Sequence, residues 1–442
     1  MKQIVFFVLV LIFSLQGISQ SSQISFEKYK LDNGLTVILY PDNTVPVVAV
    51  SVLYKVGSKD EDSSRTGFAH FFEHLLFDGS ANVKRGEFDK YITNAGGENN
   101  ANTGFDRTFY FDLLPSNQVA LGLWLESDRM MATNILDEGV ETQRQVVKEE
   151  KRLRVDNQPY GTIMENIFKR AYPPGPYNWV PIGSMEHLDA AKLEEFQNFF
   201  KKFYVPNNAI LSIAGDINVP ELKKQIQAYF GSIPRGRETV KTVFTDKPLP
   251  SEIRDVVYDN IQLPAVVQAY KGPAMGTPDY YPFNVLSTLL SQGESSRMNQ
   301  VIVDKKQEAV FAAAIPFSME RTGLLINYAI ANMGVEPEKV EKSMDSIVAD
   351  VRANLVTEKE MQKVITQIET DFVRRNATVA GIAESLADYE AYFGDANLIN
   401  TEINKYRQVT REDLREVAQK YLQPGQRVVL YYLPMSEKPA GN

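Results

Sequence analysis

The chain has 442 residues, which is too long for one ordinary domain and indicates roughly two or three. Its 44% hydrophobic and 23% charged residues are usual for a globular protein and exclude a disordered or fibrous chain. The formal net charge of −9 argues against nucleic acid as a partner, because phosphate groups are bound by a basic face. The lack of cysteine excludes disulfide bonds and thiolate metal ligands.

The first residues are typical of a secretory signal peptide. Lys2 precedes an almost wholly apolar run at 4–15, and Gly17 and Ser19 put small residues at the −3 and −1 positions of a cleavage site. The apolar run is shorter than the roughly 20 residues needed to cross a bilayer, so we predict no stable membrane anchor. We therefore predict a signal peptide at 1–20 and export, to the periplasm or outside the cell. A buried N-terminal strand or helix is the alternative.

Strand and helix patterns follow each other irregularly after this segment. Apolar runs on both sides of Asp32-Asn33-Gly34 predict a hairpin, and further strands are predicted at 47–56, 107–113 and 209–214. Helical patterns cover about 67–77, 116–132, 137–155, 189–203 and 219–230. Residues 158–182 are rich in proline and are predicted to form a long irregular loop. This order favours an α+β fold in which helices cover one face of a mainly antiparallel sheet.

A second unit repeats the end of the first. The helix that begins Leu193-Glu-Glu leads through Tyr204 into the strand at 209–214, and the helix that begins Arg411-Glu-Asp leads through Tyr421 into a strand at 427–433. A stretch with prolines and scattered charges separates the units. We predict an N-terminal domain at 21–235, a linker at 236–252 and a C-terminal domain at 253–442.

Two of the three histidines, His70 and His74, lie four residues apart with Glu73 between them. On a helix this spacing puts both imidazoles on one face, where they can bind one Zn²⁺. Glu73 can then take a proton from zinc-bound water and pass it to a leaving amine. The H-x-x-E-H order is the inverse of the commoner H-E-x-x-H. The pattern predicts a zinc peptidase with Glu73 as general base. The alternative is that two histidines of the hydrophobic core lie four residues apart by chance.

A catalytic zinc needs a third protein ligand and leaves the fourth position for water. Without cysteine, the candidates are carboxylates, and the helix predicted at 137–155 offers Glu149 and Glu150. Periodicity favours Glu150, because it shares a side of the helix with an apolar stripe of Val140, Val146, Val147 and Leu153.

Beyond the signal segment the chain resembles the pitrilysin/insulinase family of inverted-motif zinc peptidases, especially short two-domain members such as the mitochondrial processing peptidase β subunit. The resemblance rests on six segments, at 31–37, 70–80, 96–101, 181–184, 203–208 and 215–217. In that family a glutamate seventy-odd residues after the second histidine completes the zinc site. Glu150 follows His74 by 76 residues, so the resemblance implies Glu150 rather than Glu149.

The resemblance also implies a fold and a mode of substrate binding. The fold is a pair of homologous α+β domains, each a mainly antiparallel sheet covered by helices, which form half of a clam-shell chamber. Substrate adds as a strand to a sheet edge beside the zinc, where main-chain hydrogen bonds provide affinity. The matching segment here consists of Asn99, Asn100, Ala101, Asn102 and Thr103. Composition alone predicts a plain loop for them.

The sequence departs from the family pattern in two places. Gln143 stands where a glutamate often supports the metal ligands, seven residues before Glu150, so this outer support is predicted to be weaker. The second domain usually carries an arginine and, seven residues later, a tyrosine that bind the substrate backbone. Val303 and Val310 occupy these positions, and neither side chain can donate a hydrogen bond.

These residues together predict a zinc-dependent endopeptidase, with one Zn²⁺ per chain, that cleaves small or unfolded polypeptides. The loss of the Arg/Tyr pair predicts a heterodimer with a related subunit that carries the pair. The alternative is a homodimer in which Arg297 or Tyr281 supplies the donors. A non-catalytic scaffold or assembly subunit on the same fold is the alternative function.

Overall fold

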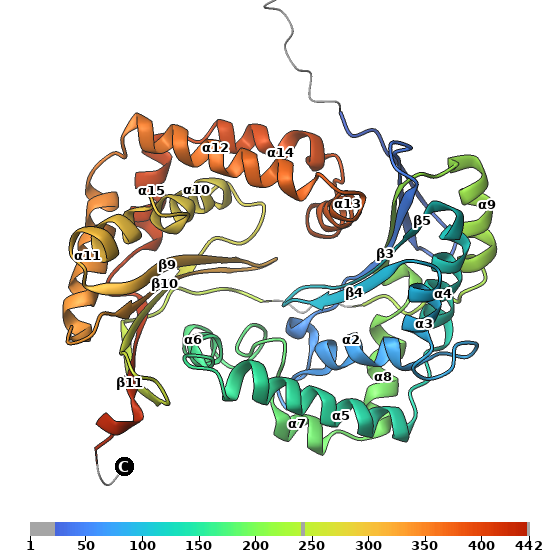
Figure 1. Cartoon of the computed structure of the whole chain (residues 1–442), viewed down its shortest axis with the longest axis horizontal. Coiled ribbons are helices and arrows are strands. Elements are labelled where there is room, and N and C mark those ends of the chain that lie inside the picture. Colours follow the sequence, from blue (N-terminus) through green and yellow to red (C-terminus); the bar gives the residue numbers. More distant parts are fainter. Residues whose placement is uncertain (1–22, 240–243, 440–442) are drawn as a thin grey trace, which may run out of the picture.

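The computed structural model describes residues 23–239 and 244–439, so the predicted signal peptide lies outside the described residues (Figure 1). The strands form two sheets. The first has the order β1-β2-β6-β3-β5-β4, with bounds Glu27–Lys30, Thr36–Pro41, Ala209–Gly215, Val47–Tyr54, Thr108–Pro115 and Glu98–Thr103. The second has the order β7-β11-β8-β10-β9, with bounds Ile253–Asp259, Arg427–Pro434, Ala265–Gly272, Gly323–Ala331 and Ala309–Ser318.

The two sheets have the same topology once β1 is set aside. Numbered along the chain within each half, the strands lie in the order first, fifth, second, fourth, third. In both sheets the first and last strands pair in parallel, β2 with β6 and β7 with β11, and the remaining pairs are antiparallel. The predicted fold of two related α+β units with mainly antiparallel sheets is confirmed.

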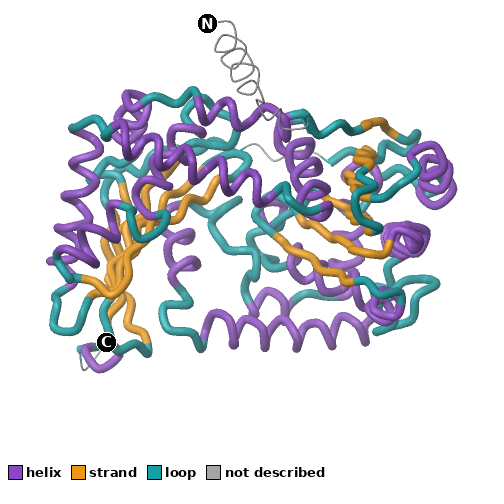
Figure 2. Tube along the Cα trace, turned by 45° about the horizontal axis from the view of Figure 1, so that its top comes forward, coloured by secondary structure: helices purple, strands orange, loops and turns teal. Residues whose placement is uncertain are grey.

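Helices surround both sheets, as the tube in Figure 2 shows. In the first half they are α2 (Phe68–Asp78), α3 (Phe88–Asn94), α4 (Val119–Ala132), α5 (Asp137–Lys151), α6 (Ile163–Ala171), α7 (Met185–Ala190), α8 (Leu193–Phe203) and α9 (Val219–Phe230). In the second half they are α10 (Tyr280–Ser291), α11 (Pro337–Ala353), α12 (Glu358–Arg375), α13 (Val379–Phe393), α14 (Leu398–Arg407) and α15 (Arg411–Tyr421). Within the described ranges, no helix has the length and apolar character needed to cross a membrane.

Each half contributes one helix to the sheet of the other half. Helix α13 packs on the first sheet, where Leu386 joins a buried cluster with Ala49 and Leu53 of β3 (Figure 1). Helix α6 packs on the second sheet, where Ile167 lies in a cluster with Leu430 of β11. Both faces of the first sheet are therefore covered, whereas the sequence predicted helices on one face. The buried contacts of α6 and α13 therefore join the two halves.

The prediction of an irregular loop at 158–182 is wrong for its middle part, where α6 forms. Ile163, Ile167 and Ala171 recur at four-residue intervals and are buried, which is the pattern of an amphipathic helix. Most of the prolines of this segment lie after the helix. The overall proline content of the segment concealed this apolar stripe.

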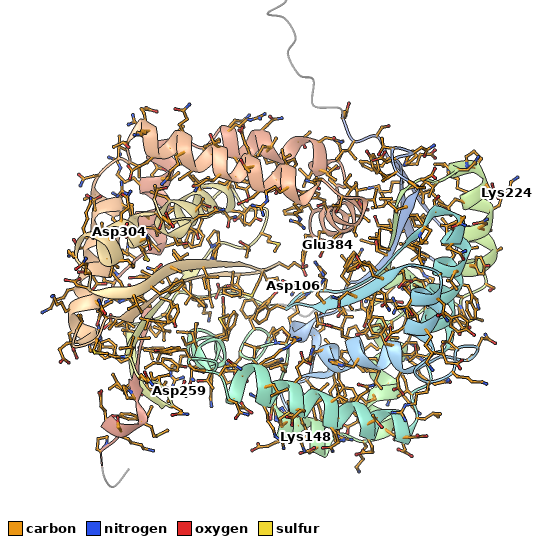
Figure 3. All side chains as sticks on the ribbon, in the orientation of Figure 1. Asp106, Lys148, Lys224, Asp259, Asp304 and Glu384 are labelled. Atoms are coloured by element: carbon orange, nitrogen blue, oxygen red, sulfur yellow. The ribbon has the colours of Figure 1, made fainter. Side chains whose placement is uncertain are left out.

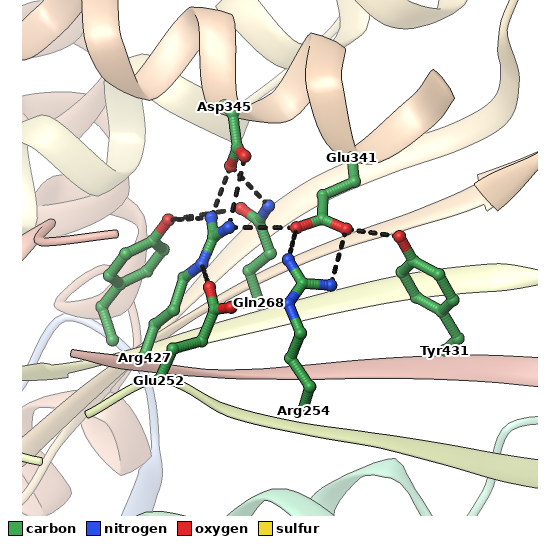
Figure 4. Close-up of polar contacts among 8 residues, drawn as sticks. Glu252, Arg254, Gln268, Glu341, Asp345, Arg427 and Tyr431 are labelled. Atoms are coloured by element: carbon green, nitrogen blue, oxygen red, sulfur yellow. Dashed lines mark hydrogen bonds and ion pairs between the residues drawn. The ribbon is translucent and has the colours of Figure 1, made fainter. Parts of the chain in front are cut away.

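A buried ion network fixes α11 to the second sheet (Figure 4). Arg427 of β11 is 3% exposed and donates to Glu341 of α11 at 3.0 Å and to Glu252 at 2.7 Å. Arg254 of β7 also binds Glu341, and Asp345 accepts hydrogen bonds from Arg427 and Gln268. The buried charges are thus paired, as burial requires, and the network is structural.

The tips of two equivalent hairpins meet between the halves. Lys59 is 8% exposed, and its Nζ lies 3.3 Å from Oδ1 of Asp106 in the β4–β5 turn and 3.0 Å from Glu320 in the β9–β10 turn. Arg107, the residue after Asp106, pairs with Glu384 of α13 at 2.6 Å. Figure 3 shows Asp106 and Glu384 in this central position. The second half therefore helps to hold the end of β4.

Candidate metal centre

Helix α2 places both sequence-predicted histidines and Glu73 on one side. Its opposite side is an apolar face of Phe68, Phe71, Phe72 and Leu75, all buried in the core of the first half. His70, Glu73 and His74 are left at the partly exposed surface that turns toward α5. Burial of the phenylalanines thus fixes the rotation of the helix about its axis. The helical period then places both histidines on the opposite, partly exposed side.

A buried carboxylate caps the start of α2. Glu61 accepts hydrogen bonds from the backbone N–H of Gly67 at 2.9 Å and of Ala69 at 2.8 Å, and from the Trp179 indole at 2.8 Å. Burial raises the pKa of Glu61 to about 8, although these donors oppose the rise. Gly67 itself has φ +98°, a left-handed conformation that favours glycine. This cap fixes where the helix begins and so where its histidines lie.

Helix α5 lies against α2 and carries Glu150 to it. Val140 and Val147 of α5 are buried in the shared core. Gly139 permits close contact, because a Cβ at this position would lie 2.5 Å from a carboxylate oxygen of Asp78 at the end of α2. Gln143 also donates to Asp78, at 3.1 Å. Gln143 therefore supports α2 one turn beyond His74 and does not contact the predicted metal ligands directly.

The structure brings His70, His74 and Glu150 together. Nε2 of His74 lies 3.1 Å, and Nε2 of His70 lies 3.5 Å, from the same oxygen of Glu150, Oε2. All three candidate ligand atoms lie within 4.8 Å of one another. Two imidazoles and a carboxylate form a donor set that suits Zn²⁺ and leaves a fourth position open. The spacing therefore fits a zinc ion held by these three residues.

The charge state of the group also suits a metal. Burial, and then His74, lower the pKa of His70 to about 4, so its imidazole is neutral at ordinary pH. The hydrogen bond with His74 is the largest cause that holds the pKa of Glu150 below its usual value. A neutral imidazole and an ionised carboxylate are the forms that bind a metal. Arg154 pairs with the other oxygen of Glu150, Oε1, at 2.7 Å.

Glu73 lies beside this group without being part of it. Its Oε2 accepts a hydrogen bond from Oγ1 of Thr103, the last residue of β4, at 2.6 Å. Burial raises the pKa of the Glu73 carboxyl, while the Thr103 hydroxyl lowers it. A carboxyl whose pKa lies above its usual range is suited to accept and return a proton near neutral pH.

Glu149, the other candidate, lies outside this group of three ligands. Its side chain is 55% exposed and pairs with Arg152 at 3.1 Å. The apolar stripe that favoured Glu150 is buried only in part: Val140 and Val147 are buried, but Val146 is 44% and Leu153 is 55% exposed. Val146 and Leu153 line a cavity of about 790 Å³, called the metal cavity below. Its other lining residues include Glu73, His74, Phe77, Ala101, Glu149 and Glu150.

The predicted substrate residues form the edge strand β4 of the first sheet, not the loop that composition predicts. Asn100 and Ala101 line the metal cavity. The Ala101 N–H donates to the Asn100 side chain at 2.8 Å, so this backbone group faces away from β5. Asn99 donates to Asp89 of α3 at 2.9 Å, and Asn102 accepts from Arg107. Of Asn99, Asn100, Ala101 and Asn102, only Asn100 and Ala101 therefore line the cavity.

The residues discussed for the missing Arg/Tyr pair lie in the second half. Val303 packs against the core there, and Val310 is 50% exposed on β9. Arg297 pairs with Asp350 at 2.6 Å and with Glu360 at 2.8 Å. Tyr281 is 7% exposed and packs edge-on against Tyr406. Arg297 and Tyr281 are thus engaged within their own half.

Thr103 belongs to the segment predicted to bind substrate, but its contact with Glu73 was not predicted from the sequence, and Arg154 was not predicted at all. Thr103 lies on the same face of β4 as Ala101, so strand alternation from Ala101 could have indicated it. Arg154 follows Glu150 by four residues, a spacing that places two helical side chains together. Here the helix continues from α5 as a π-helical segment, Arg152–Asp156, beside the cavity.

The fold and the site define a class: a two-domain metallopeptidase with an inverted H-x-x-E-H helix. The family model described as "Insulinase (Peptidase family M16)" matches residues 36–178, and "Peptidase M16 inactive domain" matches residues 190–368. Zinc protease PqqE of Helicobacter pylori is 31% identical over 420 residues, which cover 94% of each chain. The chain belongs to the insulinase family, peptidase family M16.

Other relatives agree. Mitochondrial-processing peptidase subunit beta of Blastocladiella emersonii is 27% identical over 274 residues, 61% of this chain and 57% of that protein. The crystal structure of a protease from Helicobacter pylori superposes with a TM-score of 0.88 at 30% identity and covers 93% of this chain and 100% of that one. The periplasmic protease PqqL of Escherichia coli has the same fold, with a TM-score of 0.74 at 18% identity over 94% of this chain and 48% of PqqL.

The contact between Thr103 and Glu73 generates a prediction. Thr103→Val removes the hydroxyl that orients the carboxyl, so kcat on an unfolded peptide is expected to fall about tenfold, the worth of one hydrogen bond to a charged group. KM and zinc content are expected to change little. Thr103→Ser keeps a hydroxyl and should restore kcat. Thr142→Val, the same change on the exposed side of α5, is the control; equal rates for the two valine variants would contradict the role.

Proposed function

We propose that the chain is a zinc-dependent endopeptidase that cleaves small or unfolded polypeptides. The observation that carries the proposal is the convergence of His70, His74 and Glu150 with Glu73 next to them, outside the ligand set. A Zn²⁺ ion held by the three ligands would polarise the scissile carbonyl and activate water. Family membership supports this chemistry, since relatives are named zinc proteases.

The chain's own residues supply binding and proton transfer. The free backbone groups of β4 bind the peptide as an added strand, which selects for extended rather than folded segments. Glu73 takes the proton of the attacking water and delivers it to the leaving amine nitrogen, and Thr103 holds the carboxyl in place for both steps. The exposed Val146 and Leu153 present an apolar wall beside the site.

A non-catalytic scaffold is the second candidate function. The match of residues 190–368 to a domain described as inactive favours it. That match covers mainly the second half, whereas the histidines and Glu150 lie in the first. A scaffold has no requirement for an uncoordinated, oriented Glu73, so this residue separates the two functions.

Glu73→Gln tests catalysis. The substitution leaves the three ligands in place, so zinc content is expected to stay at that of the parent chain. The hydrolysis rate is expected to fall by roughly 10²–10⁴, the usual contribution of a general base. Glu138→Gln on the exposed face of α5 is the matched control. A rate within about threefold of the parent would show that Glu73 is not the base.

We further propose that the chain works in the periplasm as a heterodimer. The predicted signal peptide at 1–20 supports export, and PqqL, of which this chain matches about half the length, is a periplasmic protease. One relative is named as a subunit. The valines at 303 and 310, and the internal contacts of Arg297 and Tyr281, leave this chain short of donors for the substrate backbone.

The heterodimer is tested by reconstitution. The candidate partner is a related subunit that carries the Arg-x6-Tyr pair and lacks H-x-x-E-H. The isolated chain is expected to cleave an unfolded peptide slowly, and the rate should rise at least tenfold when the partner is added. A partner variant with both donors replaced by alanine is the control and should not raise the rate. Full activity of the isolated chain, unchanged by the partner, would favour the homodimer.

A further inference from the structure

A second cavity lies on the opposite face of the first sheet from the metal centre. It has a volume of about 780 Å³, within the range of roughly 300–1,000 Å³ typical of ligand sites, and lies between the sheet and helices α12, α13 and α14. Its walls are mainly apolar and include Val47, Phe111, Leu113, Ile382, Ile399 and Ile403. Val45 and Val373 at the rim are 48% and 66% exposed.

Strand β4 connects this cavity with the metal cavity. Glu98, its first residue, lines the apolar cavity, whereas Asn100 and Ala101 line the metal cavity. Glu98 pairs with Leu113 and Asn100 with Phe111, and these β5 side chains face α13. A peptide added along the free edge of β4 therefore runs past both cavities.

The geometry of an added strand divides its side chains between the two faces. Successive residues of a strand point to opposite faces of a sheet, so alternate side chains of the bound peptide face α2 and the metal, and those between them face α13. Ala101 lies three residues from Glu98, which is about 10 Å at 3.3 Å per residue. A side chain that enters the apolar cavity thus belongs to a residue a few positions from the bond at the metal.

We propose that this cavity is a second specificity subsite, which receives a bulky apolar side chain of the substrate three to five residues from the cleaved bond. The inference rests on the proposed function and names its substrate class. The rim adds a charge preference: its lining residues include the carboxylates of Asp42 and Glu98 and no lysine or arginine. A Lys or Arg next to the apolar residue is therefore favoured over an acidic one.

The same features argue against a lipid as the occupant. A fatty acid would bring its own carboxylate to a rim that already carries two. The cavity is also lined by Glu98 of β4, the edge strand proposed to bind peptide. A peptide side chain uses this continuity, whereas a free lipid does not.

The test uses the enzyme in its native assembly and a set of fluorogenic peptides. A long peptide carries Phe, in turn, at each position three to five residues from the cleaved bond, on both sides, and is compared with its Ala counterpart. One position is expected to lose roughly tenfold or more in kcat/KM on Phe→Ala, as for other apolar subsites. A short peptide that ends before this position is expected to show no such dependence.

Filling the cavity should remove the preference. Ala380→Trp, on a partly buried wall residue of α13, is expected to bring the Phe/Ala ratio of the long peptide near one and to leave the short peptide's rate unchanged. Val373→Asp at the rim is the second variant and should lower the ratio in the same way. Met333→Trp, at an 84% exposed position of the second half, is the matched control and should preserve the ratio.

Each contrary outcome has a distinct meaning. Cleavage of short and long peptides without a Phe/Ala difference at any tested position would overturn the subsite and leave the proposed function intact. A preference that persists in both variants would assign it to another cavity and also overturn the inference. Dodecanoate binding that Ala380→Trp abolishes, with no effect on peptide selectivity, would assign the cavity to lipid. If no peptide is cleaved at all, the proposed function fails and the subsite with it.

Discussion

The contact between α2 and α5 is the constraint on which the site depends. Neither helix holds a complete ligand set, because the histidines are on α2 and Glu150 is on α5. Their distance is fixed by ordinary packing: Val147 is buried between them, Gly139 makes room for Asp78, and Gln143 binds the same carboxylate. A Cβ at position 139 would lie 2.5 Å from a carboxylate oxygen of Asp78, so the Asp78 side chain would have to move.

The second half of the chain contributes to the site without supplying a ligand. Helix α13 covers the back of the first sheet, and its Glu384 holds Arg107 at the tip of the β4–β5 hairpin. That hairpin carries Thr103, which orients Glu73, and the edge that faces the metal cavity. The second half of the chain therefore helps to fix the hairpin that carries Thr103.

The sequence was most informative where chemistry depends on local spacing. The pair His70 and His74, with Glu73 between them, follows from the helical period alone. Glu150 was favoured by an apolar stripe that holds only for Val140 and Val147, and the family spacing made the stronger case. Local sequence patterns do not predict contacts between distant segments. Thr103 binds Glu73, which lies 30 residues away in the sequence, and α6 packs on the sheet of the other half. The asparagines of β4 have poor strand propensity, so only pairing with β5 makes them a strand.

The central claim is that two helices jointly hold one zinc ion, with Glu150 and not Glu149 as the third ligand. It is tested most directly by the zinc content of Glu150→Gln and Glu149→Gln after dialysis against a mild chelator. The two residues are adjacent and undergo the same change, so general effects on the helix are matched. We predict that Glu150→Gln loses most of its zinc while Glu149→Gln keeps about one ion per chain. Equal loss from both, or loss only from Glu149→Gln, would contradict the account.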